Sequence, residues 1–255
     1  MKKFILAIIA STIFLGINAQ KAGYDPVNAP YGHGEDSVKC LTNLSLMSTS
    51  AKAENYKDAV QPWKAVYENC PASSRNIYIY GPRIFKALHA ETTDEAKKKE
   101  YVDLVMEIYD TRLEYFSDVD AKGTVLSYKS RDYKEMMGDK ADQKVVYNLL
   151  DEAVKDMGSE LSPSNYYYDY IVSSLYLFLE DNTKKDQFID DYFRTLDFLE
   201  GAIDSAELDD DTENVNYLGT LKESIETIFV NSGAGDCKTL QEYYSEKFEE
   251  NKDNE

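Results

Sequence analysis

Hydrophobic residues recur along the chain with the spacing of one helix face, at positions i, i+3, i+4 and i+7. The clearest stripe consists of Tyr101, Leu104, Val105, Ile108, Tyr109, Leu113 and Phe116. Similar stripes cover residues 162–178, 186–199, 215–229 and 236–248. No segment shows the alternation of a half-buried strand bounded by turn pairs. The pattern therefore predicts an all-α protein.

Residues that start and stop helices separate these stripes. Thr92, with Glu95 three positions later, forms a capping-box pattern and predicts a helix from about residue 93. Ser162-Pro163 and Asp236 are further helix starts. Helix breakers lie between the stripes, namely Pro71 with Ser73 and Ser74, Gly123, Gly138, 209–211 and 233–235. This spacing predicts about ten helices of mostly ~13 to 22 residues.

The connections between these helices are short, which places consecutive helices antiparallel in either a solenoid or a compact bundle. The pairs recur about every 40 residues, and such a period favours the solenoid. Residues 20–35, with several glycines and prolines, predict an irregular lead-in. Residues 251–255 are mostly charged and predict a disordered tail.

One hairpin, within residues 44–71, carries a repeat signature. Its residues are Leu46, Ala59, Trp63, Val66 and Pro71. The alanine lets two helices approach, the aromatic fills the cleft beside it, and the proline ends the second helix. In this register the hairpin resembles a tetratricopeptide repeat (TPR), although the later pairs lack the small-residue signature. The resemblance implies a TPR-like solenoid, a right-handed α-α superhelix of about five antiparallel helix pairs over residues 36–250.

Four stretches extend the resemblance, namely 36–46, 56–63, 69–79 and 108–116. They resemble exported TPR proteins common in Bacteroidetes, which look like interaction scaffolds of the periplasm or envelope. Such proteins are often longer, so the resemblance implies that the final repeats are lacking here.

The N-terminus has the layout of a secretory signal peptide. Lys2 and Lys3 precede an apolar run, and a small residue, Ala19, precedes a predicted cut at Gln20. The alternative is a transmembrane anchor, but the uncharged run over 4–19 is shorter than the roughly 20 residues that a spanning helix needs. We expect residues 1–19 to be removed, leaving a periplasmic or secreted protein without a membrane span.

The chain is strongly acidic, with 28 Lys+Arg against 47 Asp+Glu and a net charge of -19. Removal of Lys2 and Lys3 with the signal peptide lowers it to -21. Such a field repels polyanions and excludes nucleic acid as a partner. It favours basic or neutral partners.

Export changes the interpretation of the cysteines, because disulfides persist outside the cytosol. The turn of the first hairpin falls near residues 53–55, so Cys40 and Cys70 should lie side by side at its open end. We expect a disulfide between them, the alternative being two buried free thiols. Cys237 is interpreted as a free thiol or as one whose partner lies on another chain or in missing sequence.

Tyrosine is abundant, with 21 residues, and two clusters are candidates for a binding surface. The candidate residues are Tyr78, Tyr80, Tyr166, Tyr167, Tyr168 and Tyr170. Successive helix positions turn by about 100°, so the run at 166–170 cannot all face inward. Exposed tyrosines would give contact area for a peptide or glycan. The alternative is amphipathic filling between adjacent helices.

The sequence offers no catalytic or metal signature. His33 and His89 belong to no known catalytic motif, and the acidic run 209–213 fails the calcium-loop pattern at positions 6 and 12. We therefore expect no cofactor, no metal and no enzymatic activity. The predicted function is an exported scaffold for a protein or peptide partner. The alternative is glycan or nutrient binding through the tyrosine-rich surface.

Overall fold

The computed structural model describes residues 25–162, 165–235, 238, 241 and 245. Within them lie nine α-helices: α1 (Glu35–Lys52), α2 (Tyr56–Asn69), α3 (Asn76–Glu91), α4 (Glu95–Phe116), α5 (Lys122–Met137), α6 (Gln143–Met157), α7 (Asn165–Glu180), α8 (Lys185–Leu208) and α9 (Thr212–Ser232). Short 3-10 turns join several of them, and an isolated bridge links Asp25 to Ala29. The described part of the chain contains no strand, which confirms the all-α prediction.

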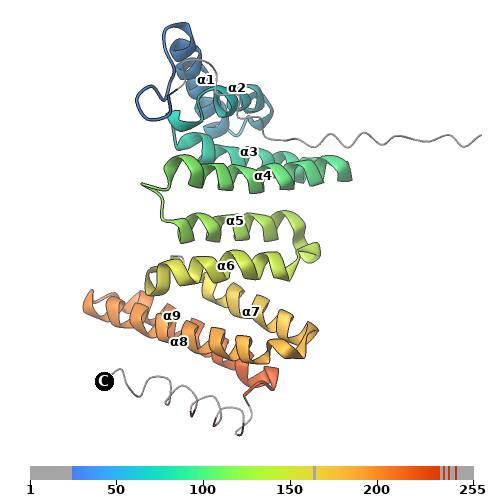
Figure 1. Cartoon of the computed structure of the whole chain (residues 1–255), viewed down its shortest axis with the longest axis vertical. Helices are drawn as coiled ribbons and strands as arrows, with labels where there is room; N and C mark the ends of the chain where they lie inside the picture. The colour runs from blue at the N-terminus through green and yellow to red at the C-terminus, as the bar shows by residue number, and fades with distance from the viewer. Residues whose placement is uncertain (1–24, 163–164, 236–237, 239–240, 242–244, 246–255) are drawn as a thin grey trace, which may run out of the picture.

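The helices stack in chain order, from α1 and α2 at one end to α8 and α9 at the other (Figure 1). Each helix packs mainly against the next one along the chain. Neighbours in sequence are therefore neighbours in space, which confirms the predicted helical-repeat solenoid. The pair α3–α4 spans residues 76–116, and its second helix contains the stripe predicted between Tyr101 and Phe116. The partner expected for α9, at 236–250, lies mostly outside the described residues, as do the signal peptide, the tail and Cys237.

The two sides of the stack differ in how closely next-but-one helices approach. On one side α1 touches α3, α3 touches α5, and α7 touches α9. The even-numbered helices lack comparable contacts with one another in the described part. Except between α5 and α7, which make no comparable contact, the odd-numbered helices therefore form the tighter, inner side, which we call the odd-helix face.

The first hairpin packs around Trp63, which is almost fully buried and donates its indole N–H to the carbonyl oxygen of Ile77 at 2.8 Å. Ala59, Val66 and Pro71 are buried as well. Leu46 is not a core residue, contrary to its place in the repeat signature, because its side chain is 51% exposed. Its neighbour Met47 faces the core and is fully buried.

Cys40 and Cys70 form a disulfide that joins α1 to the residue after α2. Their Cα atoms are 6.3 Å apart, and the bridge spans 30 residues. It closes the open end of the first hairpin, where the chain would otherwise be held by side-chain packing alone.

Gly123 does not break a helix, contrary to the sequence prediction, but lies in the first turn of α5. A Cβ atom there would stand 2.7 Å from the carbonyl oxygen of Ala153 and 3.2 Å from its Cα. Two small residues thus let α5 and α6 approach closely.

The start of α4 differs from the predicted capping box. Asp94, rather than Thr92, caps the helix, because its carboxylate accepts the backbone N–H groups of Ala96 and Lys97 at 2.9 and 3.3 Å. Thr92 instead ends α3, and its hydroxyl accepts the N–H of Asp94 at 3.2 Å. An aspartate directly before the helix satisfies the same orphan donors as the predicted threonine.

Candidate functional site

The candidate tyrosines do not form an exposed, tyrosine-rich surface, although Tyr78 lines a groove between α3 and α5 that is described below. Five of the six candidates are buried, namely Tyr78, Tyr80, Tyr166, Tyr167 and Tyr170. Tyr168 alone among them is exposed, at 40%. The physical reason is that α7 is contacted by α6, α8 and α9, so little of its circumference faces solvent. The tyrosines fill the space between adjacent helices, which is the alternative interpretation.

The buried Tyr170 belongs to a polar network that joins three helices. Its hydroxyl donates to Asp191 of α8 at 2.5 Å and lies 3.0 Å from Asp151 of α6. Ser174 donates to the second oxygen of Asp191 at 2.7 Å, and Arg194 lies 3.3 Å from the first. Burial raises the pKa of Asp191, while these donors oppose the rise. The network fixes α6, α7 and α8 relative to one another.

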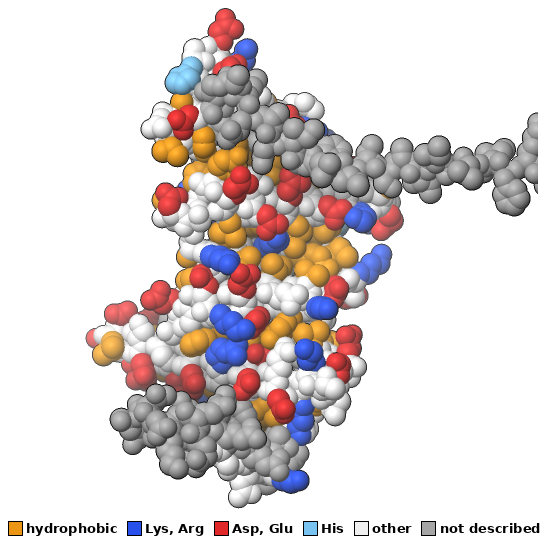
Figure 2. All heavy atoms as spheres, in the orientation of Figure 1, with side chains coloured by type: hydrophobic (Ala, Val, Ile, Leu, Met, Phe, Trp, Pro, Cys, Tyr) orange, Lys and Arg blue, Asp and Glu red, His pale blue; other side chains and the backbone are white. Residues whose placement is uncertain are grey.

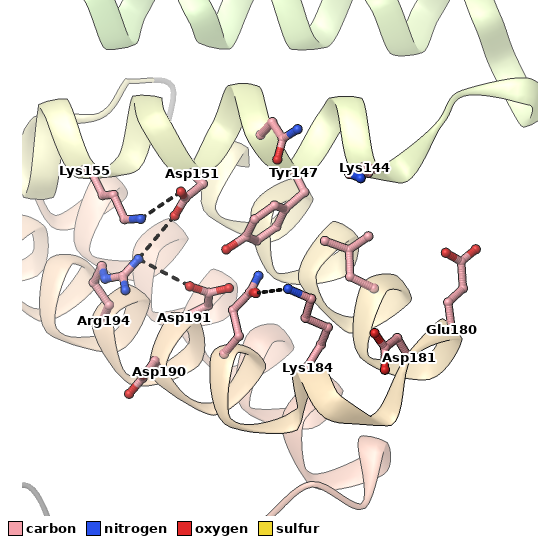
Figure 3. A pocket seen from close by; sticks show the side chains of 13 residues that line it. Lys144, Tyr147, Asp151, Lys155, Glu180, Asp181, Lys184, Asp190, Asp191 and Arg194 are labelled. Carbon is pink, nitrogen blue, oxygen red and sulfur yellow. Dashed lines mark hydrogen bonds and ion pairs between the residues drawn. The ribbon is translucent and has the colours of Figure 1, made fainter.

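This network forms one wall of a cleft of about 700 Å³ between α6, α7 and α8, which we call the α6–α8 cleft (Figure 3). Lys155 and Arg194 both point at Asp151, and Arg194 also points at Asp191. Tyr147 lies beside them. The remaining lining mixes both signs of charge: Lys144, Lys184, Glu180, Asp181 and Asp190. Such a lining suits a small polar ligand better than a charged one.

A second hollow lies where α3 and α5 meet above α4. It measures about 570 Å³, and we call it the α3–α5 groove. It is lined by Tyr78, Ile79, Pro82, Arg83, Lys86, Tyr109, Arg112, Tyr128, Arg131 and Asp132. Because α3 and α5 are adjacent odd-numbered helices, the groove opens on the odd-helix face.

Asp132 is a buried carboxylate that binds several of the side chains lining this groove. Its carboxylate is almost fully buried and accepts hydrogen bonds from Tyr109 at 2.7 Å, Lys86 at 2.8 Å and Arg131 at 2.9 Å. Burial and this carboxylate together raise the pKa of Tyr109. One buried negative charge thus holds two cations, and Lys86 is also paired with the exposed Glu135.

The two exposed arginines of the groove have similar surroundings, because each guanidinium lies over a tyrosine ring. Arg83 lies over the ring of Tyr80 at 5.8 Å, and Arg131 lies over the ring of Tyr128 at 5.0 Å. In both cases the tyrosine stands three residues before the arginine on an odd-numbered helix, which places the two side chains on one face. Within the described residues, Arg83 makes no ion pair, and the side chain of Arg131 is 49% exposed.

Next to the groove lies a polar atom without a partner. The hydroxyl of Tyr166, on α7, is buried and makes no hydrogen bond, and Ser130 of α5 has a similar orphaned hydroxyl. Burial raises the pKa of Tyr166, and the nearby Arg131 opposes the rise. A buried donor of this kind costs free energy unless a ligand or water satisfies it.

The described residues contain no group of three His, Cys, Asp or Glu side chains placed to hold a metal ion. The acidic loop after α8 acts as a helix start instead, since Asp211 accepts the N–H of Asn214 at 3.1 Å. His89 lies beside Lys98 at the end of α3, and burial lowers its pKa. No helix among the described residues is long and apolar enough to span a membrane.

Sequence reasoning missed the basic residues of the groove, Arg83, Lys86 and Arg131. The signal that could have found them is the repeated Tyr-x-x-Arg spacing at 80–83 and 128–131. The summed charge hid them, because a net charge does not show where individual cations lie, and Figure 2 shows acidic and basic side chains interspersed over the face in view. No protein-family model, curated protein or solved structure matches the chain.

Proposed function

We propose that the protein is an exported, TPR-like scaffold that binds a segment of a partner protein in the periplasm or outside the cell, without catalysing a reaction. The observation that carries this proposal is the α3–α5 groove on the odd-helix face. Stacked helices expose a continuous inner surface, and such surfaces bind extended or helical segments of other chains.

The size and chemistry of the groove support a peptide segment. A volume of about 570 Å³ accommodates a few side chains but no folded domain. Its lining combines apolar contact area from Ile79 and Pro82 with stacked Tyr–Arg pairs, a combination enriched at the centres of protein interfaces.

Site-specific photo-crosslinking tests the proposal. A photoreactive side chain is introduced at Ile79 in the groove and, as a matched control, at Asn148 in the α6–α8 cleft, and each protein is incubated with envelope extract. We expect a discrete cross-linked partner from position 79 and none from position 148. Equal capture at both positions, or none at 79, contradicts a peptide-binding groove.

A second candidate function is the binding of a sugar or small nutrient in the α6–α8 cleft. The observation that favours it is a hollow of about 700 Å³ with Tyr147 beside fixed carboxylates and a guanidinium. Hollows of ~300–1,000 Å³ are typical of small-molecule sites. Calorimetric titration with a saccharide panel tests it. Heat that disappears when Gln187→Trp fills the cleft supports this function, and absence of heat with the unaltered protein rejects it.

A further inference from the structure

We propose that the α3–α5 groove recognises an acidic segment of the partner, whose carboxylates bind Arg83 and Arg131. The inference rests on the proposed function and names the chemistry of the partner. It reverses, at this one site, the preference for basic or neutral partners that the net charge of -19 indicates.

The first argument is the local charge. Five cations lie in or beside the groove, namely Arg75, Arg83, Lys86, Arg112 and Arg131. They share three carboxylates, which are Asp120, Asp132 and Glu135. An excess of two positive charges remains, because Arg83 makes no ion pair among the described residues and Arg75 and Arg112 share the single carboxylate of Asp120. Because the rest of the chain is acidic, this excess is a local feature that a complementary partner can use.

The second argument is the way in which the arginines are held. The guanidinium of Arg83 lies over the ring of Tyr80 and makes no ion pair among the described residues. The guanidinium of Arg131 lies over Tyr128 and donates from Nε and one Nη to Asp132, so its other Nη is the donor left for a ligand. A guanidinium presents parallel N–H groups that match the two oxygens of a carboxylate. Because the side chains are already ordered, less conformational entropy is lost when a carboxylate binds.

The spacing of the two arginines sets the spacing of the ligand's acids. Adjacent packed helices stand about 8–10 Å apart, and an extended chain advances about 3.3 Å per residue. Carboxylates about three positions apart therefore match arginines on α3 and α5. The recognised sequence is acidic-x-x-acidic in an extended conformation, with the intervening residues over Ile79 and Pro82.

Fluorescence anisotropy with short labelled peptides tests this inference on the mature chain, residues 20–255. The first peptide carries two glutamates three positions apart, and its control carries glutamines at the same positions. We expect the glutamate peptide to bind at least about tenfold more tightly, the effect of losing one charge-assisted contact or more. Arg83→Gln and Arg131→Gln should each weaken this binding about fivefold or more. Lys64→Gln, which removes the same charge from an exposed position on α2, should leave it unchanged.

Three results would overturn the inference. They are equal binding of the two peptides, equal weakening by Lys64→Gln and Arg83→Gln, and preferential binding of a single-stranded oligonucleotide of matched charge. The proposed function is judged separately by the cross-linking at position 79. A partner captured there whose bound segment contains no paired acids preserves the scaffold function and rejects only the acidic specificity.

Discussion

The contact between α5 and α6 at Gly123 makes a prediction whose magnitude follows from the structure. Gly123→Ala adds a Cβ atom 2.5 Å from Cγ of Met157 and 2.7 Å from the carbonyl oxygen of Ala153. The methionine can move aside, but the backbone of Ala153 cannot, so the helices must separate by about 0.7 Å to reach an ordinary contact of 3.4 Å. Overpacking of this kind costs about 1–3 kcal/mol.

The higher helix propensity of alanine offsets at most about 1 kcal/mol of that cost, and a full offset leaves a net loss of about 0–2 kcal/mol. Gly219→Ala is the matched control, because Gly219 lies within α9 and a Cβ there meets nothing within 4 Å. That substitution should stabilise the protein by about 0.5–1 kcal/mol. Urea unfolding followed by circular dichroism measures both changes. If Gly123→Ala stabilises the protein as much as Gly219→Ala does, the close approach of α5 and α6 is refuted.

Three further predictions concern the bridge and the buried network. Replacing Cys40 and Cys70 by alanine should lower the free energy of unfolding by about 3 kcal/mol in the loop-entropy model, and no loss of stability under the same urea assay would contradict a constraint on the first hairpin. Tyr170→Phe should cost about 1–3 kcal/mol because it leaves Asp191 short of a donor, whereas Tyr168→Phe at an exposed site should cost almost nothing; equal effects would refute the network. Burial raises the folded-state pKa of Asp191, so the stability it contributes is fully present below pH 3.8 and is lost as pH rises through the folded pKa. The stability of the unaltered protein relative to Asp191→Asn should therefore fall between pH 4 and pH 7 in urea titrations, and a rise over this range would show that the donors outweigh burial.

The fold was predictable from local pattern because a solenoid is built from contacts between neighbours in sequence. The stripe on 101–116 becomes α4, whose inner residues Val105 and Ile108 are fully buried. The predicted cap and the predicted core residue were wrong by one or two positions, because a neighbouring residue could fill the same role. Asp94 replaced Thr92 as a cap, and Met47 replaced Leu46 in the core, since one step along a helix changes the face by about 100°.

The candidate site was not predictable, because it depends on which helices cover which faces. Tyrosine has a polar tip and a large apolar body, so the run at 166–170 fits a surface and a helix interface equally well. Whether these tyrosines are exposed or buried depends on how many helices pack around α7, and that number is known only from the tertiary structure. Likewise, a net charge sums over the whole chain, whereas the basic groove arises because α3 and α5 bring Arg83 and Arg131 to one face.

The central claim is that an acidic segment binds in the α3–α5 groove, and paramagnetic relaxation measures this most directly. A nitroxide-labelled peptide with two glutamates three positions apart is added to the isotopically labelled protein, and line broadening is mapped along the chain. The account predicts broadening centred on Ile79 and Tyr128, with little at Tyr147 in the α6–α8 cleft. Broadening centred on Tyr147, or spread evenly over the molecule, would contradict it.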